Sequence, residues 1–228
     1  DRLRSRGLGD VYKRQGVIWY QGEANVGRSE QYEDLFPALI TDWRRQWRSD
    51  FPFYFVQLAN FMESKEIQPD SEWAALREAQ TKALKLDQVG MAVTIDIGLA
   101  DDIHPKNKQE VGRRLALVAL VGSYGKNVSG SAPVFRNYRI KGDKMELDFG
   151  QKQDGFQIKG TTLKGFTIAG PDRVFYPAEA MVQNGKIIVF SPEVSIPLAA
   201  RYGWADNPDC NLYGENGLPV APFRTDCW

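Results

Sequence analysis

Two patterns of hydrophobic and polar residues alternate along the first half of the chain. Short, almost continuously apolar runs are typical of strands buried in a parallel sheet, and they occur at 16–20, 53–58 and 91–98. Between and after these runs, apolar residues recur at steps of three and four, which is the spacing of amphipathic helices. This spacing predicts helices over 71–86, with Ser71 as N-cap, and over about 107–121. A further helix is predicted to begin its main part near Pro37, after a short first turn.

Strands and helices that alternate in this way form right-handed βαβ units. We therefore predict an α/β fold over residues 16–125, with a mostly parallel sheet covered by helices on both faces.

The pattern changes after a Gly- and Ser-rich stretch, 122–133, which we interpret as the boundary between two regions. Residues 126–228 contain short runs in which apolar and polar residues alternate, as in half-buried strands. Asn184 and Gly185 stand between two such runs, and this dipeptide favours the type I′ turn of a β-hairpin. We predict a β-rich second region whose turn-rich tail packs back on the rest as irregular chain.

The first 15 residues fit neither pattern. They begin with Asp1 rather than Met, are rich in basic side chains and lack the apolar core of a signal peptide. We interpret residues 1–15 as a non-native, adapter-like segment and leave them out of the predicted fold. A natural basic arm is the alternative.

Charge and composition narrow the classes of function. The 29 basic and 29 acidic side chains give a formal net charge of zero, which removes the electrostatic basis for non-specific binding to nucleic acid or to an anionic membrane. No apolar run approaches the roughly 20 residues that span a bilayer. Cys210 and Cys227 are too few for a disulfide framework and, with a single histidine, make a poor zinc set. We expect two free thiols, with one bridge between them as the alternative.

The single histidine, His104, is the first candidate for chemistry. It follows the third predicted strand in the sequence DDIHP, and ligands of an open parallel sheet bind beyond the carboxyl ends of the strands. A carboxylate three residues earlier can hold the imidazole in one tautomer, so we predict His104 as a general base and Asp101 as its orienting partner. Asp102 is one residue too close and is expected to point elsewhere. A surface histidine with incidental acidic neighbours is the alternative.

A second polar cluster, QGEAN, follows the first predicted strand. Gln21 and Gly22 can offer a side-chain amide and a backbone N–H to a developing oxyanion. Glu23 is expected to brace this loop by hydrogen bonds, with a place in the substrate pocket as the alternative. An ordinary polar turn, in which glycine gives the backbone room, would explain the same residues without any chemistry.

Segments along the chain, in order, carry a family resemblance: GVIWYQGEAN, YEDLFPALITDWRRQW, FPFYFVQLANF, LREAQ, MAVTIDIG, DDIHPKNKQEVGRRLA, RYGWADNPDCNLY and GLPVAPFRTD. Together they resemble the sialate O-acetylesterase family of carbohydrate esterases, within the SGNH hydrolase superfamily. The resemblance implies the C-terminal half of a three-layer α/β/α, SGNH-type domain, followed by the β-rich region. It also implies that His104 is the base, that Asp101 is its partner, and that Gln21, Gly22 and Glu23 help to form the oxyanion site. The QGE block departs from the G-x-N-D of the wider superfamily.

By the same resemblance, the nucleophile is a serine in a block similar to G-Q-S-N at the end of a preceding strand. No serine of this chain stands in such a block or in G-x-S-x-G. We therefore expect the nucleophile to lie upstream of this sequence, and the chain to be an N-terminally truncated fragment that is inactive alone.

The implied function is that of a serine esterase that removes O-acetyl groups from sialic acid or a related acetylated sugar. We expect no metal or organic cofactor and no nucleic-acid or membrane partner. An acetylxylan-type esterase of the same fold and a non-catalytic carbohydrate-binding module are the alternatives. The family suggests a periplasmic or secreted protein, and the sequence predicts no oligomeric state.

Overall fold

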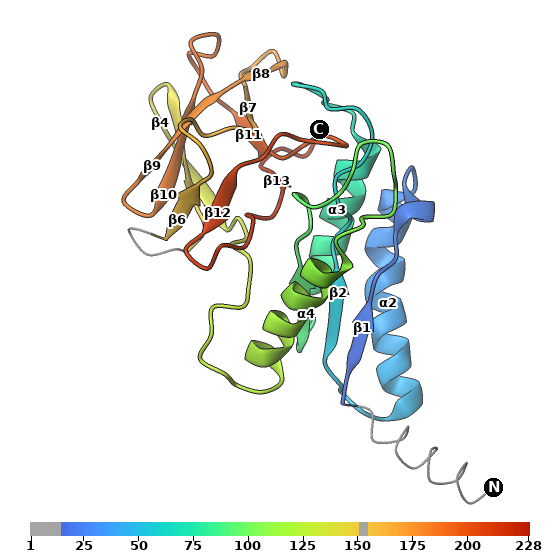
Figure 1. Cartoon of the computed structure of the whole chain (residues 1–228). Coiled ribbons are helices and arrows are strands. Elements are labelled where there is room, and N and C mark those ends of the chain that lie inside the picture. Colours follow the sequence, from blue (N-terminus) through green and yellow to red (C-terminus); the bar gives the residue numbers. More distant parts are fainter. Residues whose placement is uncertain (1–14, 151–154) are drawn as a thin grey trace, which may run out of the picture.

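The computed structural model of the chain describes residues 15–150 and 155–228, so the expected adapter-like segment lies, except for Gln15, outside the described residues. Figure 1 shows two regions side by side. We call residues 15–122 the α/β region and residues 137–228 the β-rich region. Residues 123–136, which join them, contain no helix or strand.

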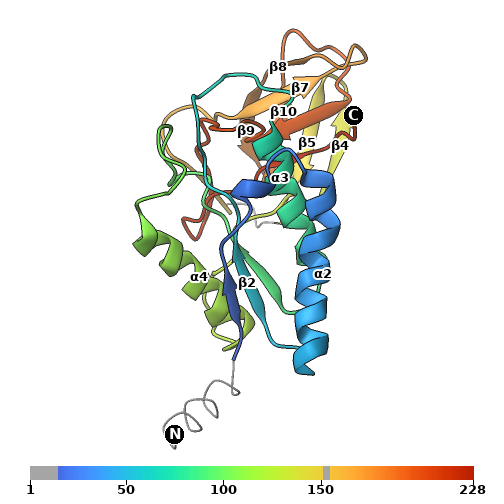
Figure 2. The ribbon, with the colours of Figure 1, turned by 90° about the vertical axis from the view of Figure 1, so that its right-hand side faces the viewer.

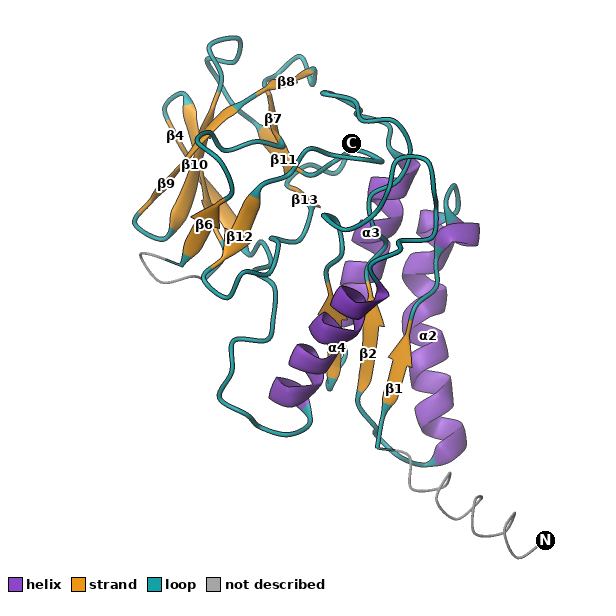
Figure 3. Cartoon of the chain, viewed as in Figure 1, coloured by secondary structure: helices purple, strands orange, loops and turns teal. Residues whose placement is uncertain are grey.

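Three parallel strands form the sheet of the α/β region, in the order β1-β2-β3. They are β1 (Val17–Trp19), β2 (Phe53–Val56) and β3 (Val89–Ala92). The arrows of β1 and β2 point the same way in Figure 3. Every residue of β2 is buried, as expected of a central parallel strand.

The strand predicted over 91–98 is displaced and shorter than its apolar run. Val93, Thr94 and Ile95 are still buried, but side-chain hydrogen bonds replace strand pairing there. Arg114 Nη1 donates to the Val93 carbonyl at 2.7 Å, and Thr94 Oγ1 donates to the Gln57 carbonyl at 2.6 Å.

Helices cover both faces of this sheet, as predicted. On one face, α2 (Ser29–Trp47) and α3 (Glu72–Lys82) pack against the strands, and α4 (Lys108–Gly122) packs against the other face. Figure 2 shows the two sets on opposite sides of β2. Phe53 and Phe55 of β2 belong to the first core and Tyr54 and Val56 to the second, because successive side chains of a strand point to opposite faces.

Two predicted helices are confirmed, the first of them together with its predicted N-cap. Ser71 Oγ accepts from the Ala74 N–H at 3.0 Å at the start of α3, and a short 3-10 turn, η2 (Ala83–Lys85), extends this helix to nearly the predicted end. Asn107 Oδ1 accepts from the Glu110 N–H at 3.1 Å at the start of α4.

Helix α2 differs from its prediction, since it runs unbroken from Ser29 through Pro37. A proline removes one backbone hydrogen bond and costs about 3 kcal/mol in a helix interior. Tyr32, Phe36 and Ile40 are nevertheless buried on one face, on both sides of the proline. Tertiary packing of that face outweighs the local penalty.

In its described residues, the β-rich region contains two four-stranded antiparallel sheets and one strand pair. The first sheet has the order β4-β5-β10-β9 and consists of β4 (Asn137–Lys141), β5 (Lys144–Asp148), β10 (Lys186–Phe190) and β9 (Glu179–Gln183). The second has the order β13-β11-β7-β8 and consists of β13 (Phe223–Arg224), β11 (Ala199–Tyr202), β7 (Phe166–Ala169) and β8 (Phe175–Pro177). The pair consists of β12 (Leu212–Gly214) and β6 (Phe156–Ile158). Both sheets contribute to one core, with Leu147 and Val189 from the first and Ile168 and Tyr202 from the second.

The predicted hairpin is confirmed, because β9 and β10 pair antiparallel across Asn184 and Gly185. Both turn residues have positive φ, 51° and 73°, as a type I′ turn requires. The tail, which was predicted to be irregular chain, is partly strand, since it supplies β12 and β13. Its Ala221 reaches the core of the α/β region. Cys210 and Cys227 are free thiols.

Candidate active site

The loops that follow β1 and β3 meet at the carboxyl edge of the parallel sheet. Tyr20, directly after β1, lies in hydrogen-bonding contact with Thr94, which follows β3. The Lys108 ammonium, at the start of α4, lies 5.0 Å from the centre of the Tyr20 ring. Burial, and next the Glu23 carboxylate, raise the pKa of Tyr20 to about 12. The two polar clusters predicted from the sequence therefore share one edge of the sheet.

Gln21 is held at both ends of its side-chain amide. Its Nε2 donates to Asn25 Oδ1 at 2.6 Å, and its Oε1 accepts from the Tyr32 hydroxyl at 3.1 Å. Its backbone carbonyl accepts from Gln80 Nε2 at 3.1 Å. A primary amide has two N–H donors, so Nε2 keeps one for a further acceptor. The sequence patterns did not single out Asn25, Tyr32 and Gln80, although all three lie in segments that carry the family resemblance.

Gly22 makes the turn in which Gln21 stands. Its φ of 149° lies in the region that favours glycine, and the residue is buried. A Cβ here would lie 3.1 Å from Gln80 Nε2 and 3.3 Å from Leu76 Cδ2. Glycine at this position therefore fits both the backbone and the space. Its N–H as an oxyanion donor stays a prediction.

Glu23 was expected to brace the loop by hydrogen bonds. In the part of the chain that the structure describes, its carboxylate makes no hydrogen bond. Its charge instead adds to the effect of burial in raising the pKa values of Tyr20 and Tyr32. Its backbone begins the 3-10 turn η1 (Glu23–Asn25).

His104 stands in the loop between β3 and α4, and its side chain is 84% exposed. The carboxylate that contacts its ring belongs to Asp102, with Oδ1 3.4 Å from Nδ1, which is too long for a good hydrogen bond. Asp102 Oδ1 also accepts from the His104 backbone N–H at 2.9 Å, and this bond is the main reason why the pKa of Asp102 is below its usual value.

The prediction that Asp102 points elsewhere is therefore wrong, because its side chain closes a turn onto the backbone of His104. Asp101 is exposed and makes no contact with His104 among the described residues. Its role as the orienting carboxylate stays a prediction.

A buried ion pair lies under the segment that leads to His104. Asp96 accepts from Arg114 Nη1 and Nη2 at 2.6 and 2.9 Å, and the Arg114 side chain is only 5% exposed. The Tyr213 hydroxyl of the β-rich region donates to the same carboxylate at 3.1 Å. Burial, and next the Asp96 charge, raise the pKa of Tyr213 above its usual value. This network joins the segment to α4 and to the β-rich region, and no local motif in the sequence predicts it.

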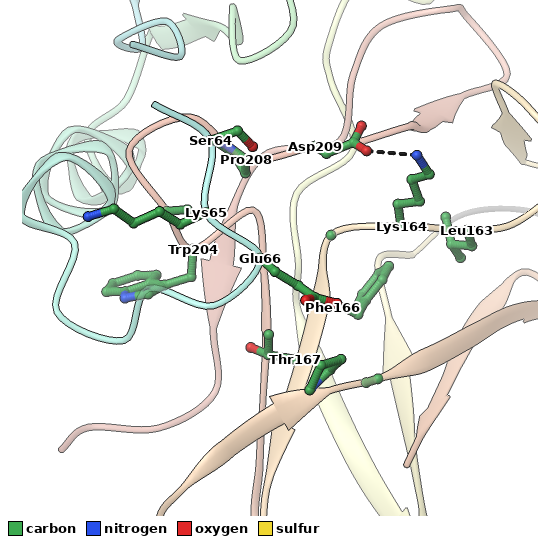
Figure 4. A pocket seen from close by; sticks show the side chains of 14 residues that line it. Ser64, Lys65, Glu66, Leu163, Lys164, Phe166, Thr167, Trp204, Pro208 and Asp209 are labelled. Atoms are coloured by element: carbon green, nitrogen blue, oxygen red, sulfur yellow. Dashed lines mark hydrogen bonds and ion pairs between the residues drawn. The ribbon is translucent and has the colours of Figure 1, made fainter. Parts of the chain in front are cut away.

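A cavity of about 480 Å³ opens between the loop after Met62 and the β-rich region (Figure 4). Trp204 and Glu66 line it, and at its rim Lys164 Nζ lies 2.7 Å from an oxygen of Asp209. The loop lies close to the catalytic candidates, because the Met62 N–H donates to the Ala100 carbonyl at 3.1 Å. The volume is within the range of small-ligand sites.

Two classes of feature are absent from the described residues. No group of three or more His, Cys, Asp and Glu side chains there could hold a metal ion. No helix in residues 15–150 and 155–228 has the length and apolarity needed to cross a bilayer.

Comparisons with known proteins agree on one group of enzymes. A family model described as "Carbohydrate esterase, sialic acid-specific acetylesterase" matches residues 2–120. Sialate O-acetylesterases from Mus musculus and Homo sapiens are both 30% identical, over 92% of this chain and 44% and 45% of their own lengths. The crystal structure of a carbohydrate acetylesterase from Xanthomonas citri is 45% identical, with a TM-score of 0.88 over 94% of this chain and 51% of the other. The chain thus spans about half the length of the relatives it matches.

Proposed function

Because the chain belongs to the sialic acid-specific acetylesterase family of carbohydrate esterases, we propose that it takes part in the hydrolysis of O-acetyl esters on sugars. One observation carries the proposal. The chain's single histidine stands exposed, next to carboxylates, beyond the carboxyl edge of a parallel sheet, where such sheets bind ligands.

In the proposed reaction, a serine hydroxyl attacks the acetyl carbonyl while His104 takes the serine proton. The sugar oxygen leaves with that proton, and an acetyl-enzyme remains. His104 then takes a proton from water as that water attacks the acetyl carbonyl, and it gives this proton to the serine oxygen when acetate leaves. The remaining Nε2 hydrogen of Gln21 is proposed to donate to the oxyanion, supported by the contacts that fix its amide.

The proposed nucleophile reaches His104 from a strand beside β1. Among the described residues no serine contacts the His104 ring, and β1 pairs with β2 on one side only. Ile18, at the centre of β1, is 71% exposed. A further parallel strand and its helix would cover Ile18 and complete a three-layer α/β/α sheet of the SGNH type.

The cavity in Figure 4 is the proposed place of the sugar. Trp204 offers an aromatic surface to the C–H face of a sugar ring, and Glu66 offers acceptors to its hydroxyls. Glu66→Gln is expected to raise KM several-fold with little change in kcat, since it removes uniform binding. The matched control is Glu179→Gln, an exposed carboxylate on β9. Assays on O-acetylated sialic acid and on acetylated xylo-oligosaccharides decide which sugar is preferred.

The central test is His104→Ala in the protein encoded by the complete gene. Acetate release from an acetylated sugar should fall about 10²- to 10⁴-fold, because positioned acid–base catalysis contributes about that much. Asp101→Asn and Asp102→Asn form a matched pair. We expect Asp101→Asn to impair kcat strongly and Asp102→Asn much less. The opposite order would make Asp102, which already contacts the ring, the orienting residue, and unchanged turnover in His104→Ala would refute the proposed function.

The chain by itself provides a second test. It should hydrolyse an acetylated chromogenic ester only at the background rate and take up no fluorophosphonate probe, because none of its serines stands in a nucleophile motif. Rapid turnover with stoichiometric labelling of one of its own serines would show that the nucleophile is not supplied from elsewhere.

A further inference from the structure

The loop that carries His104 is fixed at its beginning by a second loop, which follows β2. Phe61 and Leu99 form an isolated parallel bridge between the two. The Met62 N–H donates to the Ala100 carbonyl at 3.1 Å, one residue before Asp101. The two loops therefore run together up to the candidate catalytic residues.

Asn60 joins these loops through its side chain. Its Oδ1 accepts from the Gly98 N–H at 2.7 Å, and its Nδ2 donates to Asn207 Oδ1 at 2.7 Å. The Asn207 Nδ2 in turn donates to the Met62 carbonyl at 2.6 Å. Gly98 has no room for a side chain, because a Cβ there would lie 1.9 Å from the Asn60 carbonyl oxygen. Two amides thus connect the β-rich region to the start of the His104 loop.

The turn that carries Asn207 is itself firmly anchored. Arg77 is fully buried, and its guanidinium donates to the carbonyls of Ala205 and Asp206 at 2.8 and 2.7 Å. The Asp206 carboxylate accepts from Ser71 Oγ at 2.6 Å. Asn207 is therefore placed by the core of the α/β region, although it belongs to the other region.

The His104 ring gains little orientation from its own contacts, since it is 84% exposed and its one described polar contact is 3.4 Å long. Its position depends on the backbone of the loop. We propose that Asn60 and Asn207 are positioning residues that set the place of His104 through Gly98 and Ala100. That this positioning matters for catalysis rests on the proposed function, whereas the effect of Asn60 and Asn207 on the structure of the loop does not.

The test compares Asn60→Ala and Asn207→Ala with Asn211→Ala. Asn211, like Asn207, belongs to the β-rich region; it is buried, and its Nδ2 donates to the carbonyls of Lys159 and Thr162, away from the His104 loop. Asn60→Ala and Asn207→Ala should each speed hydrogen exchange of the Gly98 amide at least about tenfold. Each should also shift or broaden the NMR signal of the His104 ring. In protein without a histidine tag, that signal is the only one of its kind. Asn211→Ala should lower the unfolding midpoint and leave both observables unchanged.

A conservative variant sharpens the result. Asn207→Asp keeps an acceptor for Asn60 Nδ2 but loses the donor to the Met62 carbonyl, so Gly98 should stay more protected than in Asn207→Ala. In the active protein, the two alanine variants should lower kcat about 10- to 100-fold with KM nearly constant, as expected of a misplaced catalytic group.

Unchanged Gly98 exchange and an unchanged His104 signal in both alanine variants would overturn the proposal. Equal changes in Asn211→Ala would overturn it as well, because they would show general destabilisation. Failure of the proposed function is seen separately, as full turnover in His104→Ala.

Discussion

The α/β region and the β-rich region place their polar side chains differently. In the α/β region, Gln21 and His104 stand on loops beyond the strand ends, accessible to a ligand. In the β-rich region, polar side chains point toward the α/β region instead. Asn207 and Tyr213 donate hydrogen bonds to loops at the carboxyl edge of the parallel sheet. The residues proposed to react therefore come from the α/β region alone, whereas the residues that hold them come from both regions.

The largest effect is expected from Arg77→Met, which breaks the link between the two regions. The guanidinium donates to four backbone carbonyls, two in each region: Leu58, Ala59, Ala205 and Asp206. The carbonyls of Ala59 and Asp206 keep a second donor, from Trp73 Nε1 and from the Phe61 N–H. The buried carbonyls of Leu58 and Ala205 lose theirs at about 1–3 kcal/mol each, so the free energy of unfolding should fall by about 3 kcal/mol or more. Urea unfolding followed by tryptophan fluorescence measures it.

The control for this variant is Arg45→Met, because the Arg45 side chain is 76% exposed and its one ion pair with the described residues is with Asp42 on the surface. Its effect should stay below about 0.5 kcal/mol. Two separate unfolding transitions in the wild-type chain would mean that the regions are independent, against this comparison.

Gln21→Ala tests the accessible polar side chains of the α/β region. Loss of one oxyanion donor should lower kcat about 10²-fold or more and change KM little, because the bond strengthens as charge develops on the oxygen. Tyr32→Phe, which removes one bond that holds the same amide, should have a much smaller effect of the same kind. A change in KM alone would make Gln21 a substrate-binding residue.

Gly98→Ala tests the meeting point of the two loops. The added methyl group would lie 1.9 Å from the Asn60 carbonyl oxygen, so the loops must separate. The expected destabilisation is about 1–3 kcal/mol, measured by urea unfolding. Gly112→Ala is the matched control, since its Cβ meets no atom within 4 Å in α4 and should stabilise the helix by about 0.5–1 kcal/mol. A neutral Gly98→Ala variant would show that the contact is not close in solution.

The smallest effects concern acid stability and compare one carboxylate from each region. Hydrogen bonds from Arg113 lower the pKa of Glu110 to about 2, and a hydrogen bond from Lys141 lowers the pKa of Glu146 to about 2. A folded-state pKa below the unfolded value of 4.5 means that each contribution is present above about pH 4.5 and is lost as the pH falls toward 2.

Glu110→Gln and Glu146→Gln should therefore each reduce stability at pH 7 by about 1 kcal/mol and make the loss between pH 5 and pH 3 less steep. Urea unfolding at several pH values measures both. A steeper acid loss in either variant would reverse the sign and contradict the pairing.

The sequence predicted what local patterns determine. Apolar runs gave the three parallel strands, and Asn184-Gly185 gave a hairpin, because each depends on neighbouring residues. Pro37 misled the prediction for α2, since burial of Tyr32 and Phe36 outweighs a local penalty.

In the candidate site, His104 could be found because it is unique, and the QGE block because it follows a strand. The contact of Asp102 could not, because it depends on how the loop folds onto its own backbone. Asn60 and Asn207 are separated by 147 positions, and no spacing rule connects two asparagines so far apart.

Arg77 also limits how this protein can evolve. The segment 123–136 has no helix or strand, so recombination there would interrupt no secondary structure when one second domain replaces another. A recombinant with a foreign second half would bury the same guanidinium with only the carbonyls of Leu58 and Ala59 as acceptors. The two halves must therefore be inherited together, unless the incoming module brings carbonyls to the same two places.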